Sequence, residues 1–159
     1  MTTLKSILAT IFVPGIACLL IPYFILRGSD IPLAHALGFW QIIAIPVAIV
    51  GVYMVVWVSF SFVRTGRGTP IPIDPPKHLV VHGLYRYVRN PMYVGAMLVL
   101  LAEVVYYSSI WVFIYTTFLW MALHTFTVVL EEPQLKRRFG TEYERYLESV
   151  PRWVPRVRV

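Results

Sequence analysis

Four long apolar runs divide the chain, and polar or proline-containing segments separate them. The runs cover residues 7–26, 39–63, 91–107 and 110–131. An α-helix needs about 20 residues to cross a hydrocarbon core of about 30 Å, and only the third run is short by this measure. The pattern therefore predicts an all-α integral membrane protein with four transmembrane helices.

Composition agrees with this fold class. Of the 159 residues, 58% are hydrophobic and 14% are charged, whereas an ordinary soluble domain has about 25% charged residues. We therefore expect one membrane domain over residues 1–159, in which the net charge of +6 reflects topology and not nucleic-acid binding. The only cysteine, Cys18, lies inside the first run, which excludes an internal disulfide and a cysteine-based metal site, and no metal is expected.

A tight turn near Ser108 and Ser109 makes the third and fourth runs an antiparallel hairpin, which predicts that Pro91 and Glu131 lie at the same membrane face. The basic residues gather before the third run and after the fourth: Arg64, Arg67, Lys77, Arg86, Arg89, Lys136, Arg137, Arg138, Arg145, Arg152, Arg156 and Arg158. With four crossings, all of these lie on one side. Because cytoplasmic segments are rich in Lys and Arg, the multi-pass chain is expected to have both termini and the long loop in the cytosol.

The polar connections carry local signals. Residues 64–77 contain four prolines and two glycines, which predicts an extended segment that covers the mouth of the bundle. Pro133 predicts a break or bend of the fourth helix at Glu132. The following stretch, residues 133–159, is expected to form an interfacial tail.

Within this tail, Gly140 is typical of a helix end, and Thr141 with Glu144 fits a capping box that opens a short helix. The face of that helix is apolar and aromatic, and it is expected to lie on the membrane surface. It consists of Tyr143, Tyr146, Leu147 and Val150.

Polarity is concentrated in residues 82–95, directly before the third run. Asn90 followed by Pro91 predicts a helix start, since an Asn oxygen can accept from the first free N–H groups and Pro fits the first helical position. These N–H groups and the positive end of the helix dipole attract an anion. A second polar cluster, Glu131 and Glu132, ends the fourth run.

One set of motifs fills the C-terminal half, residues 77–155: Gly83-Leu84-Tyr85, Arg89-Asn90-Pro91-Met92-Tyr93-Val94-Gly95, Glu131-Glu132, and Phe139-Gly140 with Tyr143, Tyr146 and Val150-Pro151. In this combination the chain resembles the superfamily of isoprenylcysteine carboxyl methyltransferases and phospholipid methyltransferases. The resemblance implies an integral membrane enzyme that moves a methyl group from S-adenosylmethionine to a lipid-like or small hydrophobic acceptor, at the cytosolic membrane face.

Carried over by position, the resemblance implies a cofactor site made of Lys77, His78, Leu79, Val80, Tyr85, Asn90, Pro91, Met92, Tyr93 and Glu131. Two positions depart from the family pattern. Asn90 stands where the family usually has His. Thr127 stands where the isoprenylcysteine branch has an Arg that binds the substrate carboxylate, which argues against carboxyl methylation of prenylated cysteine.

The chemistry of the cofactor agrees with these residue types. A sulfonium and an ammonium favour aromatic faces and acids, which Tyr85, Tyr93 and Glu131 supply, and a carboxylate favours a helix start. An ammonium acceptor must lose a proton, for which Glu132 and His82 are the candidate catalytic residues, with His78 also within reach. The candidate substrate-binding residues are Arg89, Thr127 and His124.

Other interpretations remain open at this point. A membrane reductase that uses a nicotinamide cofactor would have a similar C-terminal half. A non-enzymatic four-helix transporter of the small multidrug type would have a similar length, but it needs an acidic residue in its first helix, and residues 7–26 contain none. The acids and tyrosines singled out above are also compatible with interfacial charges and an aromatic belt.

Overall fold

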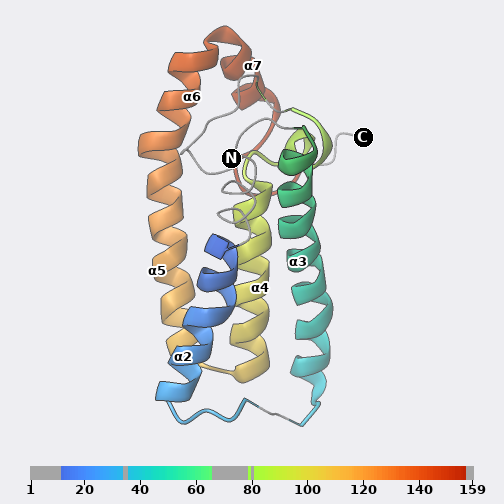
Figure 1. Cartoon of the computed structure of the whole chain (residues 1–159), viewed down its shortest axis with the longest axis vertical. Helices are drawn as coiled ribbons and strands as arrows, with labels where there is room; N and C mark the ends of the chain where they lie inside the picture. The colour runs from blue at the N-terminus through green and yellow to red at the C-terminus, as the bar shows by residue number, and fades with distance from the viewer. Residues whose placement is uncertain (1–11, 34–35, 66–78, 80, 157–159) are drawn as a thin grey trace.

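The computed structural model describes residues 12–33, 36–65, 79 and 81–156. Every element in these ranges is helical, with no strand among them, which confirms the all-α class. The helices run side by side along the long axis of the molecule, as Figure 1 shows. The main ones are α2 (Ile21–Gly28), α3 (Phe39–Thr65), α4 (Pro91–Tyr107) and α5 (Ile110–Phe126). The predicted cover, residues 64–77, falls from residue 66 onward outside the described residues.

Two described helices are long and apolar enough to cross a membrane: Phe39–Ser61, with 23 residues, and Ile110–Phe139, with 30 residues. Two further apolar helices, Phe12–Gly28 and Pro91–Tyr107, are shorter. The outer faces carry large exposed apolar side chains, including Phe118, which is 65% exposed. Such faces are suited to lipid. Four apolar helices thus correspond to the four expected runs, while four complete crossings stay a prediction.

Two π-helical turns of five residues interrupt the α-helices, η1 (Ile16–Leu20) and η3 (Thr127–Glu131). Each turn ends two residues before a proline, Pro22 after η1 and Pro133 after η3. Proline cannot donate a backbone hydrogen bond, and its ring crowds the carbonyl four residues earlier. A wider turn before the proline relieves this conflict and keeps the helix continuous.

The sequence predicted a break or a bend at Glu132, and the break is wrong. The helix that begins at Ile110 continues through η3 into α6 (Glu132–Phe139), and Pro133 stands in the first turn of α6. The Glu132 N–H donates to the Thr127 carbonyl, five residues earlier, so the pattern of helical hydrogen bonds has already shifted at the point where Pro133 lacks an N–H. The π turn thus places Pro133 where a helix tolerates it.

Close packing of α3 against α4 depends on two facing glycines. A Cβ added at Gly51 would lie 2.6 Å from the Gly95 carbonyl oxygen, and one added at Gly95 would lie 2.8 Å from the Gly51 carbonyl oxygen. Small residues let helix backbones approach closely in membrane proteins. This contact fixes the position of α4, whose first turn carries Tyr93.

We expect Gly51→Ala to destabilise the protein by about 1–2 kcal/mol, because the cost of overpacking exceeds the gain in helix propensity. Thermal unfolding in detergent micelles measures the change. Gly15→Ala is the matched control, because a Cβ at this helical glycine meets nothing within 4 Å. Equal unfolding temperatures for the two variants would contradict the proposed role of the glycine contact.

The hairpin between α4 and α5 is confirmed. Ser108 adopts a left-handed conformation with φ of 48° after the last residue of α4, and the Ser109 hydroxyl accepts a hydrogen bond from the Val112 backbone N–H at 3.3 Å. Ser109 thus caps the start of α5. The hairpin brings the start of α4 and the end of η3 to the same end of the bundle, at the top of Figure 1.

The turn after α6 is also confirmed, because Gly140 ends α6 with a φ of 54° and leads into α7 (Thr141–Ser149). The predicted capping box is wrong: no side chain caps α7, and Glu144 forms an ion pair with Lys136 at 2.8 Å instead. The carboxylate of Glu144 therefore reaches back to α6 and is not available to the start of its own helix.

The apolar face of α7 forms as predicted but packs inside the protein. Tyr143, Tyr146 and Val150 are buried, with exposed fractions of 2%, 8% and 7%. Their partners come from the preceding loop and from α6 and α7: Leu79, Leu135, Phe139 and Leu147. The expected contact of this face with the membrane surface is thus wrong, because α6 and the loop already supply its apolar partners.

Candidate active site

Tyr93 and Glu131 meet at the end of the bundle where α4 begins and η3 ends. The hydroxyl of Tyr93 lies within hydrogen-bonding range of the Glu131 carboxyl group, and both side chains are half-buried. The two clusters that the sequence separates by nearly forty residues are thus neighbours. This confirms the geometric consequence of the predicted hairpin.

Two polar atoms at this place are buried without a hydrogen-bond partner of good geometry, Thr127 Oγ1 and Glu131 Oε2. Thr127 is only 1% exposed. Two other threonines of the same helix, Thr116 and Thr117, donate to the carbonyl four residues earlier. The Thr127 hydroxyl nevertheless lies within hydrogen-bonding range of the Glu131 carboxyl group, so the two side chains face each other. A buried acceptor without a well-aligned donor, such as Glu131 Oε2, costs about 1–3 kcal/mol, and a ligand that donates a hydrogen bond to it would offset this cost.

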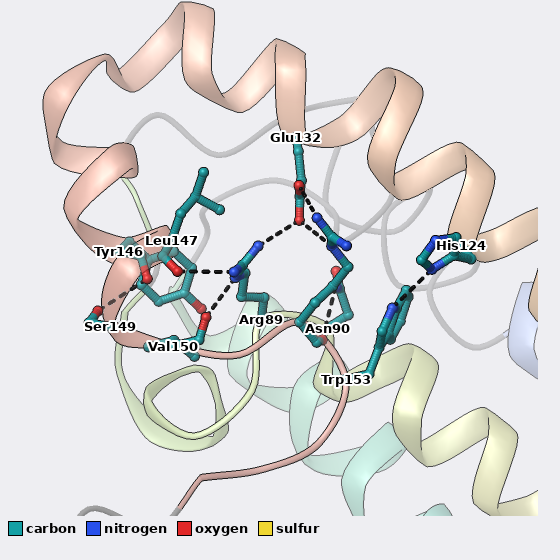
Figure 2. A network of polar contacts seen from close by, with 10 residues as sticks. Arg89, Asn90, His124, Glu132, Tyr146, Leu147, Ser149, Val150 and Trp153 are labelled. Atoms are coloured by element: carbon teal, nitrogen blue, oxygen red, sulfur yellow. Dashed lines mark hydrogen bonds and ion pairs between the residues drawn. The ribbon is translucent and has the colours of Figure 1, made fainter.

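Glu132 lies beside this pair and holds two arginines, as Figure 2 shows. Its carboxylate accepts from Arg89 Nη1 at 2.8 Å and from Arg152 at 2.7 and 2.8 Å, a two-pronged contact. The side chain of Glu132 is 14% exposed and that of Arg89 is 15% exposed. The hydrogen bond with Glu132 raises the pKa of Arg152, so this cation stays charged.

Arg89 also forms hydrogen bonds with the end of α7 and with the segment that follows it. Its side chain donates to the Val150 carbonyl at 2.6 Å and to the Leu147 carbonyl at 3.0 Å, and its backbone N–H donates to the Pro151 carbonyl at 2.9 Å. Asn90 Nδ2 donates to the Arg152 carbonyl at 3.3 Å. Residues 150–152 therefore lie along the stretch that leads into α4.

Trp153 continues this contact across the site. Its indole N–H donates to His124 Nδ1 at 3.1 Å. Its ring centroid lies 6.5 Å from that of Tyr93 and 4.6 Å from that of Trp120. Trp153 of the tail thus lies between Trp120 and His124 of α5 on one side and Tyr93 of α4 on the other. Because Nδ1 accepts, the hydrogen of a neutral His124 ring is on Nε2.

Residues 39–142 match the family model for phospholipid methyltransferases. The chain belongs to this family. The match extends from the start of α3 into α7 and includes Tyr93, Thr127 and both acids of the site. No curated protein and no solved structure matches the chain significantly.

Membership of the phospholipid methyltransferase family supports methyltransferase activity on a lipid-like substrate. Together with the two apolar helices of sufficient length, it identifies a membrane protein. Of the functions left open by the sequence, the match favours the methyltransferase over the reductase and the transporter.

Within this member of the phospholipid methyltransferase family, several predicted cofactor residues have core positions. Pro91 and Met92 are buried, and Met92 packs with Val58 beside Leu84 and Tyr85. Burial, and then the nearby carboxylate of Glu131, raise the pKa of Tyr85, so its phenol stays neutral close to the site. The Tyr85 carbonyl also accepts from the Tyr146 hydroxyl at 2.8 Å.

The remaining predicted residues lie away from Tyr93 and Glu131 or fall outside the described residues. Asn90 precedes α4 as predicted, but its side chain donates to the tail and does not cap the helix, so the expected Asn cap is wrong. His82 is exposed just before η2 (Gly83–Arg86), and Leu79 packs against the α7 cluster. Three predicted cofactor residues lie outside the described residues: Lys77, His78 and Val80.

Two residues of the site were missed by the sequence analysis, Arg152 and Trp153. Arg152 counted there only as a charge that sets topology. Nothing in the composition of residues 150–156 shows that this segment returns to the start of α4, because the return depends on single contacts with Arg89, Glu132 and His124. The family match also ends before this segment.

The cofactor that the family generally uses is compatible with the residues present. S-adenosylmethionine carries two cationic groups, and the site offers an acid with one buried oxygen unpaired, Glu131 Oε2. Tyr93 and Trp153 provide aromatic faces beside it. The first N–H groups of α4 provide a place for a carboxylate.

Proposed function

We propose that this protein transfers a methyl group from S-adenosylmethionine to a lipid-like acceptor at the cytosolic face of the membrane. The observation that carries the proposal is the unpaired, buried Glu131 Oε2 next to Tyr93. The family match supports the reaction class. The basic residues cluster in the segments before α4 and after α5, at the end of the bundle that holds the site. This clustering supports a site on the cytosolic side of the membrane.

The bound cofactor supplies a methyl group on a sulfonium sulfur, whose S–C bond breaks as the bond from the acceptor to the methyl carbon forms. The protein has to align these atoms and exclude water. Glu131 would accept hydrogen bonds from the ammonium group of a bound cofactor, and the ring of Tyr93 would offer its face to a cationic group. The start of α4 holds the carboxylate through its free N–H groups.

The acceptor side is formed by residues one and two turns before Glu131. Thr127 presents a buried hydroxyl beside Glu131, and His124 presents an Nε2–H when neutral, since its Nδ1 accepts from Trp153. Both groups can hold a polar part of the acceptor while its apolar chain stays in the bilayer. Arg89 was predicted to bind substrate, but in this arrangement it acts as a positioning residue for the tail.

The hydrogen-bond partners also distinguish the two predicted bases, Glu132 and His82. Both oxygens of Glu132 accept from arginines, so we assign Glu132 the role of holding Arg89 and Arg152. An acceptor proton passes to His82 in this proposal, because His82 is exposed at the same end of the bundle. An acceptor that reacts without losing a proton needs no base.

Isothermal titration of the purified protein in detergent tests the proposal. S-adenosylhomocysteine, the product form of the cofactor, is expected to bind, and a reduced nicotinamide nucleotide is not. Cofactor with a labelled methyl group, offered together with total membrane lipid, then identifies the acceptor through the labelled product. Binding of the nicotinamide nucleotide without binding of S-adenosylhomocysteine would overturn the methyltransferase in favour of the reductase.

Tyr93→Ala is expected to weaken binding of S-adenosylhomocysteine about tenfold, because it removes both the hydroxyl beside Glu131 and an aromatic face. Titration calorimetry measures the change. Tyr53→Ala is the control, because Tyr53 lies on the outer face of α3 and is 61% exposed. If both variants bind with the affinity of the unaltered protein, Tyr93 is not part of the cofactor site.

A further inference from the structure

A cavity lies at the same end of the bundle, between η2, α7 and the tail. Its volume is about 420 Å³. The polar part of its lining consists mainly of Arg86, Tyr87, Glu142, Arg145, Ser149 and Arg156. None of the residues around Glu131 that form the candidate active site lines this cavity.

The lining is strongly basic. Arg86, Arg145 and Arg156 face a single acid, Glu142. In the part of the chain that the structure describes, none of these arginines takes part in an ion pair, since the ion pairs there involve Arg89, Arg152 and Lys136. A cavity with three unpaired guanidinium groups attracts an anion. The planar fork of arginine matches the oxygens of a phosphate group in particular.

The three arginines are exposed and come from three different elements around the cavity. Arg86 ends η2, and Arg145 lies on the α7 face that also carries Glu142 and Ser149. The backbone N–H of Arg156 donates to the Tyr87 carbonyl at 3.1 Å, which anchors the tail at the cavity wall. The site is thus built by the fold and is not a chance cluster on one helix.

The position of the cavity agrees with a lipid ligand. Arg86 precedes the first residue of the apolar helix α4 by only a few positions. If α4 crosses the hydrocarbon core, its start lies at the boundary, and the headgroup layer occupies roughly the next 5–7 Å. Basic pockets at this level are suited to anionic headgroups.

We propose that this cavity binds the phosphate group of a phospholipid headgroup through Arg86, Arg145 and Arg156. The proposal does not depend on S-adenosylmethionine as cofactor, and it concerns a site separate from Tyr93 and Glu131. The same chemistry would accept a phosphate ester dissolved in the cytosol. The membrane-level position favours the lipid.

The test uses the full chain in detergent micelles and three probes: dioctanoyl phosphatidic acid, dioctanoylglycerol and inorganic phosphate. Native mass spectrometry and titration calorimetry report binding. We expect phosphatidic acid to bind at least tenfold more tightly than dioctanoylglycerol, which has the same chains without the phosphate. Inorganic phosphate that binds as tightly as phosphatidic acid would assign the cavity to soluble phosphate and overturn the lipid ligand.

Substitutions locate the site. The double variant Arg145→Gln and Arg156→Gln is expected to bind phosphatidic acid at least tenfold more weakly, and Arg156→Gln alone several-fold more weakly. The single variant guards against misfolding, because Arg156 is exposed on the tail. Arg137→Gln is the matched control, since Arg137 is exposed on α6 and does not line the cavity. Equal affinity in the Arg156 and Arg137 variants would overturn the proposal.

The outcome is independent of the proposed reaction. Phosphatidic acid that binds in a protein without affinity for S-adenosylhomocysteine would refute the proposed cofactor and leave the phosphate site in place. The converse result would refute only the phosphate site.

Discussion

Glu131→Gln is expected to weaken binding of S-adenosylhomocysteine by about ten- to a hundredfold. Hydrogen bonds to a charged group contribute about 1.5–3 kcal/mol, and each 1.4 kcal/mol changes a binding constant about tenfold. The fold is expected to remain intact, because the oxygen of a glutamine side chain can still accept from the Tyr93 hydroxyl, and Glu131 Oε2 accepts no well-aligned hydrogen bond that the substitution would remove. Titration calorimetry and thermal unfolding, both in detergent, measure the two quantities.

Glu148→Gln is the control for this prediction. Glu148 is exposed on α7, so the substitution removes the same charge from a place without a proposed ligand. Its affinity for S-adenosylhomocysteine is expected to equal that of the unaltered protein. If Glu131→Gln gives the same result as Glu148→Gln, the acid is not part of the cofactor site.

Glu132→Gln is expected to lower the free energy of unfolding by about 2–4 kcal/mol. Removal of one partner from a buried ion pair costs about 3–5 kcal/mol, and the value is reduced here because Arg152 is 31% exposed. The substitution leaves Arg89 charged and only 15% exposed. Thermal unfolding in detergent measures the loss, and faster cleavage by trypsin after Arg152 reports release of the tail.

Glu144→Gln provides the comparison, because it removes an ion pair from the same region with much less burial. The side chains of Lys136 and Glu144 are 59% and 45% exposed. Exposed pairs contribute little to stability, so the unfolding temperature is expected to change only slightly. A loss as large as that of Glu132→Gln would show that burial of the Glu132 cluster is not what stabilises the tail.

The helices and the meeting of Tyr93 with Glu131 could be predicted from the sequence for a simple reason. A long apolar run in a membrane protein forms a helix, because a backbone N–H or C=O group without a hydrogen bond costs several kcal/mol in lipid. A short turn between two such helices then decides which ends are neighbours. Both steps depend on patterns of many residues, and α4 accordingly has the predicted bounds, Pro91–Tyr107.

Features that depend on a few contacts were not predictable in this way. The signals at Pro133 and at Thr141 with Glu144 are local preferences worth about 1–3 kcal/mol each. A π turn and an ion pair with Lys136 outweigh them. The return of the tail to Arg89 and Glu132 has no periodic pattern at all, which is why Arg152 and Trp153 were missed.

The π turn η3 also sets the angle about the helix axis between the side chains of His124 and Glu131. A π turn is equivalent to one extra residue within an α-helix, and each residue advances around the helix axis by about 100°. Removal of that residue would swing His124 by roughly this angle relative to Glu131, although no side chain had changed. The relative orientation of His124 and Glu131 in the candidate site thus depends on the register of the backbone, and insertion or deletion of one residue in η3 would change it without any change of side chain.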